Sequence, residues 1–257
     1  SKITGSADDG INVFDKATLT ITGGTITGKK QGVYAVGSTV TINGGTISGV
    51  DRGVYTGYCT VIISDGTISG RFGVDAIETD LIISDGTISG DLLSVYSEYS
   101  TVTISGGSFS TGDQHIYSDN STIPLTLGEN GVGARFLGGI TVRCATLNEI
   151  LGEGAAYWQG DKQIIPADNA TAIFNGDVVI KAYVAPVHSG WTEIDGDWYY
   201  YDPDTGKPVT GITRVPYPAQ TINGITYAPD QESIDYAASK GQTFIDETTG
   251  LFIFDEN

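Results

Sequence analysis

Residues 17–28 read ATLTITGGTITG, and the chain repeats this pattern about every 21 residues. Four further copies follow: STVTINGGTISG from Ser38, CTVIISDGTISG from Cys59, TDLIISDGTISG from Thr79 and STVTISGGSFST from Ser100. A repeat of fixed length is typical of a stacked architecture in which each copy forms one structural unit. The repeat therefore decides the fold. It also implies that the same side chain can be presented many times along the molecule.

The apolar residues of the five copies fall into four columns when the copies are aligned by their glycines. The columns are Leu19, Val40, Val61, Leu81 and Val102; Ile21, Ile42, Ile63, Ile83 and Ile104; Ile26, Ile47, Ile68, Ile88 and Phe109; and Val33, Val54, Val74, Val95 and Ile116. Alternation with a period of two and an abundance of Val, Ile and Thr indicate β-strands. Gly-Gly or Asp-Gly pairs between the second and third columns tolerate the positive φ of a sharp corner.

Three short strands per repeat keep these columns in register only if each repeat coils and stacks on the one before it. The result is a parallel β-helix, with the columns inside and neighbouring coils about 4.8 Å apart. The GGTISG-type copies resemble the Gly-rich right-handed parallel β-helices of bacterial surface proteins. We therefore expect an all-β chain with a right-handed parallel β-helix over residues 1–127, at about 20–21 residues per coil.

Beyond the last copy the repeat fades, and an open stack of strands needs a cover to prevent pairing with other chains. The motif TLNE at residues 146–149 is a capping box, and Gly152 ends the short helix that it begins. Strand-like segments follow at residues 163–166 and 177–184. We expect residues 128–187 to form the last irregular coils and a cap.

Composition narrows the range of partners. The net charge is −18 and the sequence pI is about 4.1, which excludes nucleic acid and anionic membrane surfaces as expected partners. No run of 18 apolar residues occurs, so we expect no membrane insertion. Cys59 stands where other copies carry Ser or Thr, and we expect no disulfide between it and Cys144. Because the chain begins within repeat-like sequence, we expect it to be a trimmed or mature fragment.

The composition changes at Gly190, where the chain reads GWTEIDGDWYYYDPDTGKPVTG. This stretch resembles one cell-wall-binding repeat of the choline- and glucan-binding type. The matching residues are Gly190, Trp191, Gly196, Trp198, Tyr199, Tyr200, Thr205, Gly206, Thr210 and Gly211. We expect residues 188–257 to form a β-hairpin module related to these repeats.

The resemblance implies that aromatic side chains of this module surround a quaternary ammonium group or stack on a sugar ring. Trp191, Trp198 and Tyr200 are the candidate ligand-binding residues. Ile212 stands where the next repeat would carry its Trp, which leaves a choline cage incomplete. In the alternative interpretation, these aromatic residues form only the core of a small hairpin module.

The residue after the fourth column points outward in each coil, because alternate residues of a strand face opposite sides. After Asn12, these positions hold five candidate glycan-binding residues, which we call the tyrosine row: Tyr34, Tyr55, Asp75, Tyr96 and Tyr117. Aromatic rings repeated at one coil rise suit an extended polysaccharide, since sugar faces stack on such rings. In the alternative, the tyrosines stack on one another and stiffen the sheet. A second outward row, formed by Tyr58, Glu78 and Tyr99, would widen the platform.

Acidic residues raise the question of an enzyme, because some parallel β-helices cleave polysaccharides with clustered acids or a bound cation. Asp65 and Asp85 occupy equivalent positions in adjacent coils and could share a calcium ion. They are also Asp-Gly corner residues, which need no metal. His115 and His188 have no nucleophile in a recognisable context. We predict no catalytic residue, no metal ion and no cofactor.

Together these patterns predict a non-catalytic protein of the cell surface or cell wall of a Gram-positive bacterium, or a secreted one. Its expected role is an adhesin-like stalk that binds a cell-wall or host glycan. The alternative is a lyase or hydrolase of acidic polysaccharides, and a third interpretation is a spacer that binds nothing. The sequence identifies neither the glycan nor the oligomeric state.

Overall fold

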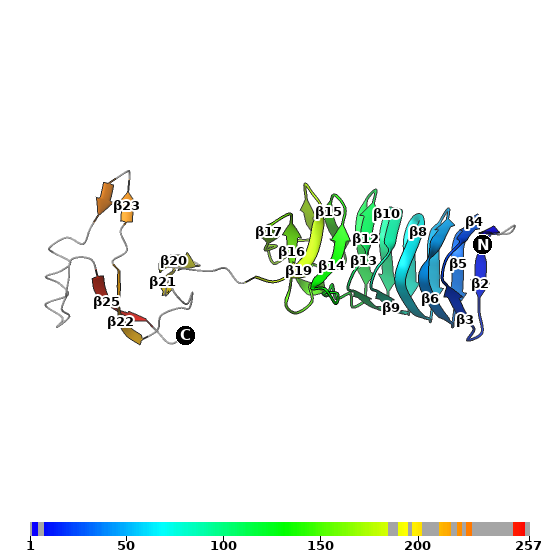
Figure 1. Cartoon of the computed structure of the whole chain (residues 1–257), viewed down its shortest axis with the longest axis horizontal. Helices are drawn as coiled ribbons and strands as arrows, with labels where there is room; N and C mark the ends of the chain where they lie inside the picture. The colour runs from blue at the N-terminus through cyan, green and yellow to red at the C-terminus, as the bar shows by residue number, and fades with distance from the viewer. Residues whose placement is uncertain are drawn as a thin grey trace. The chain divides into compact units, whose positions relative to one another are not determined.

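The computed structural model describes residues 2–4, 8–184, 190–194, 197–201, 211–216, 220–222, 225–227 and 249–254. The chain divides into two compact units, Ser1–Val184 and Ala185–Asn257. The first unit is a β-solenoid of about five turns whose strand pairs are mostly parallel. Figure 1 shows its strands lying side by side from β2, in blue, to β15, in green. The predicted parallel β-helix is confirmed.

Each coil contributes one strand segment to each of three faces. The first face comprises β3 (Thr18–Ile21), the starts of β6 (Thr39–Gly49) and β8 (Thr60–Ile77), β9 (Asp80–Ile83) and β11 (Thr101–Ile104). The second comprises β1 (Lys2–Thr4), β4 (Thr25–Gly28), later parts of β6 and β8, the start of β10 (Thr87–Glu98) and β12 (Ser108–Thr111). The third comprises β2 (Ile11–Val13), β5 (Gln31–Val36), β7 (Arg52–Gly57), the ends of β8 and β10, and β13 (Gln114–Asp119).

The strand register places all four predicted columns inside the solenoid. Ile42 pairs with Ile63 and Ile47 with Ile68, and these side chains are fully buried. Leu19, in the first of these coils, is only partly buried. The columns extend beyond the repeats, because Phe109 pairs with Phe136 and Ile116 with Val142. The hydrophobic core is therefore a continuous stack of like residues rather than one central cluster.

Glycines at the third-face corner form a further internal column that the sequence analysis did not single out. A β-carbon at Gly32, Gly53 or Gly73 would stand 2.7 Å from a carbonyl oxygen of the next coil. It would also stand within 2.7 Å of an isoleucine methyl group of the third apolar column. These glycines allow the third face to approach the isoleucine column closely. In the next coil Ser94 takes this position, and a register shift follows Gly90.

The cap begins where the strands reverse direction. Strands β14 (Val132–Phe136) and β15 (Gly139–Arg143) still pair in parallel with the coil before them. Their other edges pair antiparallel with β19 (Val178–Ala182) and β18 (Ala172–Phe174). Strands β16 (Ala155–Gln159) and β17 (Lys162–Ile164) complete the antiparallel arrangement. The parallel stack therefore ends in a reversed sheet.

Helix α1 (Leu147–Ile150) lies between β15 and β16, and its predicted capping box is confirmed. The Glu149 backbone N–H donates to the Thr146 hydroxyl, and the Thr146 backbone N–H donates to the Glu149 carboxylate. The helix buries Leu147 and Ile150. The buried Tyr157 hydroxyl donates to the Leu147 carbonyl oxygen at 2.7 Å, which ties the helix to β16.

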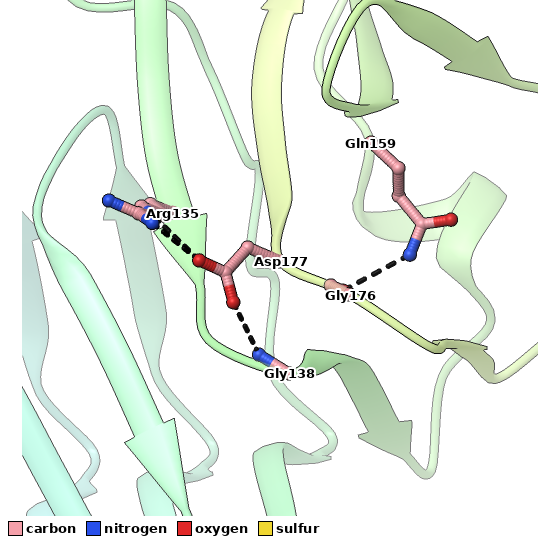
Figure 2. A network of polar contacts seen from close by, with 5 residues as sticks. All are labelled: Arg135, Gly138, Gln159, Gly176 and Asp177. Carbon is pink, nitrogen blue, oxygen red and sulfur yellow. Dashed lines mark hydrogen bonds and ion pairs between the residues drawn. The ribbon is translucent and has the colours of Figure 1, made fainter.

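Asp177 fastens the cap to the last parallel strands, as Figure 2 shows. One carboxylate oxygen accepts hydrogen bonds from the Arg135 guanidinium of β14. The other accepts from the Gly138 backbone N–H at 2.8 Å. The Gly138 bond and the guanidinium hold the pKa of the Asp177 carboxyl below its usual value. The Gln159 amide donates to the Gly176 carbonyl oxygen at 3.1 Å and orders the same segment.

The second unit contains three antiparallel strand pairs among its described residues. They are β20 (Gly190–Ile194) with β21 (Asp197–Tyr201), β22 (Gly211–Pro216) with β25 (Thr249–Phe254), and β23 (Gln220–Ile222) with β24 (Ile225–Tyr227). The first pair spans the start of the motif that resembles a wall-binding repeat. The first and third pairs are local hairpins, whereas β22 and β25 come from segments far apart in the sequence.

Candidate functional site

The tyrosine row lies in register on the third face of the solenoid. The paired positions run Asn12, Tyr34, Tyr55, Asp75, Tyr96 and Tyr117, and Tyr117 then pairs with Arg143. All five members of the row follow a buried residue of the fourth column. The sequence therefore brings these candidate residues together on one surface, one per coil.

The tyrosines of the row stack in two pairs. The rings of Tyr34 and Tyr55 lie 4.9 Å apart with an angle of 7° between their planes. Those of Tyr96 and Tyr117 also lie 4.9 Å apart, at 16°. This is the arrangement of the alternative interpretation, in which the tyrosines stiffen the sheet. Stacking covers one face of each ring, so a ligand has access only to edges, hydroxyl groups and the remaining faces.

Asp75 separates the two stacked pairs and forms an ion pair with Arg52 of the preceding coil. The Arg52 guanidinium lies 5.3 Å from the Tyr55 ring centroid and 5.6 Å from that of Phe72. Phe72 in turn meets Tyr96 edge to face at 6.1 Å. Arg52 and Phe72 were not among the candidate residues predicted from the sequence, although the two pair directly across adjacent coils. The two residues occupy the same position in the aligned copies, three residues before a member of the tyrosine row. That shared position could have indicated that they lie side by side next to the row.

A depression of about 260 Å³ lies at Asp75, the position at which a carboxylate interrupts the tyrosine row. Its lining residues are Arg52, Phe72, Asp75, Ile77 and Tyr96. Asp75 is 3% exposed, and its Oδ1 atom has no hydrogen-bond partner among the described residues. Buried polar atoms are nearly always hydrogen-bonded, so this carboxylate is the unusual group of the surface.

Burial governs the acid–base properties of the depression. It raises the pKa of the Asp75 carboxyl above its usual value, and the Arg52 guanidinium offsets only part of this effect. Burial, followed by a hydrogen bond with Glu98, raises the pKa of Tyr96 to about 12. The Tyr96 hydroxyl donates to the Glu98 Oε2 atom at 3.1 Å. Tyr96 is therefore a neutral hydrogen-bonding group at physiological pH.

The second outward row lies at a corner where the backbone is left-handed. The φ angles are 54° at Tyr58, 47° at Glu78 and 47° at Tyr99. Bulky residues rarely adopt this conformation, and strained residues of this kind occur at functional sites. Tyr58 and Tyr99 are 64% and 59% exposed. A hydrogen bond to Glu78 raises the pKa of the Tyr58 hydroxyl.

The corner carboxylates have a structural role. Asp65 and Asp85 each accept a hydrogen bond from the backbone N–H of the following glycine. Gly66 and Gly86 have φ angles of 115° and 107°, as the corner prediction requires. Asp85 also lines a larger depression of about 670 Å³, together with Glu129. Within the described part of the chain, no group of three His, Cys, Asp or Glu residues is placed to hold a metal ion.

Of the remaining titratable candidates, Cys144 meets the tyrosine row, and a hydrogen bond with its thiol raises the pKa of the Tyr117 hydroxyl. His115 is buried and packs edge-on against Phe136, with ring centroids 5.5 Å apart. His188 lies outside the described residues. Cys59 is buried and Cys144 exposed, and both are free thiols. None of these residues lines the depression at Asp75.

The candidate residues of the C-terminal module lie on the hairpin formed by β20 and β21. The backbone register sets Trp191 opposite Tyr200 and Trp198 opposite Glu193. The three candidate aromatic residues therefore belong to one two-stranded element. The Asp202–Gly211 part of the motif falls mostly outside the described residues.

No family model matches the chain, and neither a curated protein nor a solved structure matches it. Among the described residues, no helix has the length and apolar character needed to cross a membrane.

Proposed function

We propose that the chain is a non-catalytic, adhesin-like stalk that binds a cell-wall or host glycan outside the cell. The observation that carries this proposal is the tyrosine row, which aligns one candidate residue on each of five consecutive coils, four partly exposed tyrosines and the buried Asp75. A ligand that repeats along its own length can contact such a row at several points. Extended glycans have this property.

The chemistry of the row supports a weak, repeated mode of binding. The hydroxyl groups of the stacked tyrosines offer hydrogen bonds and their ring edges offer apolar contacts, and Tyr58 and Tyr99 add exposed aromatic surface nearby. Contacts of this kind are individually weak but gain in avidity when several are made at once. The net charge of −18 favours neutral glycans over acidic ones.

The C-terminal module supports a location at the cell surface or cell wall. Its motif resembles wall-binding repeats, and Trp191, Trp198 and Tyr200 lie on a hairpin. In the proposed arrangement this module contacts wall glycan while the solenoid presents its third face. The two contacts are independent, so each can be removed without the other.

A glycan array tests this proposal. The wild type is compared with a Tyr55→Ala/Tyr96→Ala double variant, a Trp191→Ala/Trp198→Ala double variant, and a Tyr183→Ala control. Tyr183 is exposed but lies outside the tyrosine row. We expect the first variant to lose binding to the glycan recognised by the solenoid and the control to retain it. Binding that survives in both double variants, or no binding by the wild type, would contradict the proposal.

One observation favours the second candidate, an enzyme acting on polysaccharide. Asp85 and Glu129 line the larger depression together, and paired carboxylates perform glycoside hydrolysis. The assay is product release from neutral and acidic polysaccharides by the wild type and by Asp85→Asn and Glu129→Gln variants. Turnover that disappears in both variants would establish the enzyme and replace the non-catalytic proposal.

A further inference from the structure

We infer that the interruption of the tyrosine row at Asp75 is a subsite for one neutral sugar ring. In this subsite the ring packs against Tyr96 and Phe72 and donates a hydroxyl hydrogen bond to Asp75. The inference rests on the proposed function and deepens it, because it assigns one position of the row to recognition and leaves the stacked tyrosines as its supports.

The shape of the tyrosine row suits a single ring. Neighbouring coils are about 4.8 Å apart, so two coil rises separate Tyr55 from Tyr96. The Arg52 guanidinium lies over the Tyr55 ring within this interval, and the depression beside it is lined by Phe72 and Tyr96. The depression found there has a volume of about 260 Å³. Pockets for drug-sized ligands measure roughly 300–1,000 Å³, so this one suits a single ring. Tyr117 covers one face of Tyr96, and Tyr96 still contributes surface to the depression.

Asp75 has unsatisfied hydrogen-bonding capacity. One carboxylate oxygen accepts from Arg52, and the other is buried without a partner among the described residues. A sugar hydroxyl supplies the missing donor, and a neighbouring hydroxyl can accept from Arg52. Arg52 bounds the depression and its side chain is 28% exposed, so a shift of the guanidinium opens the way to the buried oxygen.

The charge and the apolar lining of the depression favour a neutral sugar over other ligands. An anionic sugar would meet Asp75, nearby Glu98 and the net negative charge of the protein. A phenylalanine side chain from a peptide could fill the gap but would leave the carboxylate oxygen unpaired, which is unfavourable. A neutral sugar offers both an apolar ring face and hydroxyl donors. The site therefore fits a neutral hexose unit of a longer glycan.

The test measures binding of neutral hexaoses (β-1,4-glucan, α-1,4-glucan and β-1,4-mannan) by calorimetry and by aromatic NMR shifts. The variants are Asp75→Asn, which removes the charge, and Asp75→Tyr, which supplies the missing tyrosine and fills the depression. Asp80→Asn, on the exposed first face, is the matched control. Thermal melts establish that each variant is folded, and polygalacturonate and a Phe-containing hexapeptide are the competing probes.

We expect one hexaose to shift the Tyr96 and Phe72 signals. Its affinity should fall about 10- to 100-fold in Asp75→Asn and disappear in Asp75→Tyr, while the control binds like the wild type. Equal binding by all four proteins would overturn the subsite while leaving the proposed function intact. Saturable binding of the peptide or polygalacturonate instead of a neutral hexaose would also overturn it. Failure of the wild type to bind any glycan on the array would overturn the proposed function itself.

Discussion

Gly53 lies directly against Ile68 in the interior of the solenoid. A β-carbon at position 53 would stand 2.5 Å from the Ile68 Cγ2 atom and 2.7 Å from the Gly73 carbonyl oxygen. Both neighbours belong to the stacked interior, where packing is too dense to accommodate them elsewhere. The close approach of the third face to the isoleucine column therefore depends on the absence of a side chain at this position.

We predict that Gly53→Ala lowers the free energy of unfolding by about 3 kcal/mol, because the added methyl group overpacks the interior. The measurement is urea denaturation followed by circular dichroism. Gly23→Ala is the matched control, because a β-carbon at Gly23 meets nothing within 4 Å. Equal small effects of the two substitutions would show that the coils are not packed as described.

Arg52 and Asp75 differ in exposure, which makes the effects of removing them unequal. Arg52→Ala leaves a buried carboxylate without its partner, whereas Asp75→Ala leaves a guanidinium that can reach solvent. We predict that, at pH 7, Arg52→Ala lowers the free energy of unfolding by about 3 kcal/mol and Asp75→Ala lowers it by about 1–2 kcal/mol. Because protonation neutralises the stranded Asp75, the loss in Arg52→Ala should shrink as the pH falls towards 4. Denaturation of both variants and of Arg71→Ala, an exposed arginine near Phe72, tests this order.

Tyr99 occupies the corner at which an earlier coil carries Gly37, and both have positive φ, 47° and 59°. A left-handed conformation is unfavourable for residues other than glycine. We predict that Tyr99→Gly raises the free energy of unfolding by about 0.5–1 kcal/mol, since relief of strain exceeds the entropy lost by glycine. Tyr99→Ala keeps the strain and should bring no gain. If thermal melts show the same stability for both variants, the corner is not strained.

His115 makes the stability depend on pH. Burial lowers its pKa from 6.5 to about 4, so between these values the unfolded chain binds a proton that the folded protein does not. The contribution of the neutral imidazole is complete above pH 6.5 and is lost as the pH falls towards 4. In the wild type, the free energy of unfolding should fall by as much as about 3 kcal/mol through this effect as the pH is lowered over this range. We predict that His115→Gln removes this fall.

Asp75 affects the pH dependence of stability in the opposite direction to His115. Its raised pKa makes the folded protein more stable as the pH falls. Denaturation midpoints of the wild type and His115→Gln are therefore compared at each pH, since Asp75 is common to both. Parallel pH profiles of the two proteins would contradict the assignment to His115.

The sequence was sufficient to predict the parallel stack, since a column such as Ile42, Ile63 and Ile83 has only one arrangement that keeps it buried in every coil. The tyrosine row followed from the same register. The depression at Asp75 could not be predicted, because it depends on the direction in which the Arg52 side chain turns along the solenoid axis. The antiparallel pairing of the cap strands could not be predicted either, because residues 132–182 carry no repeat that fixes which strands pair.

The reversal of strand direction at β14 and β19 has a mechanical consequence. Each parallel coil is held mainly by the hydrogen bonds to the coils on either side, whereas the antiparallel sheet also joins β14 to β19, for example Val132 to Lys181. Under tension applied to the chain ends, the parallel coils would peel away one at a time. Each would release about 21 residues, or about 70 Å of extended chain. The force–extension record of one molecule would then show evenly spaced steps from the coils and a separate event when the reversed sheet ruptures.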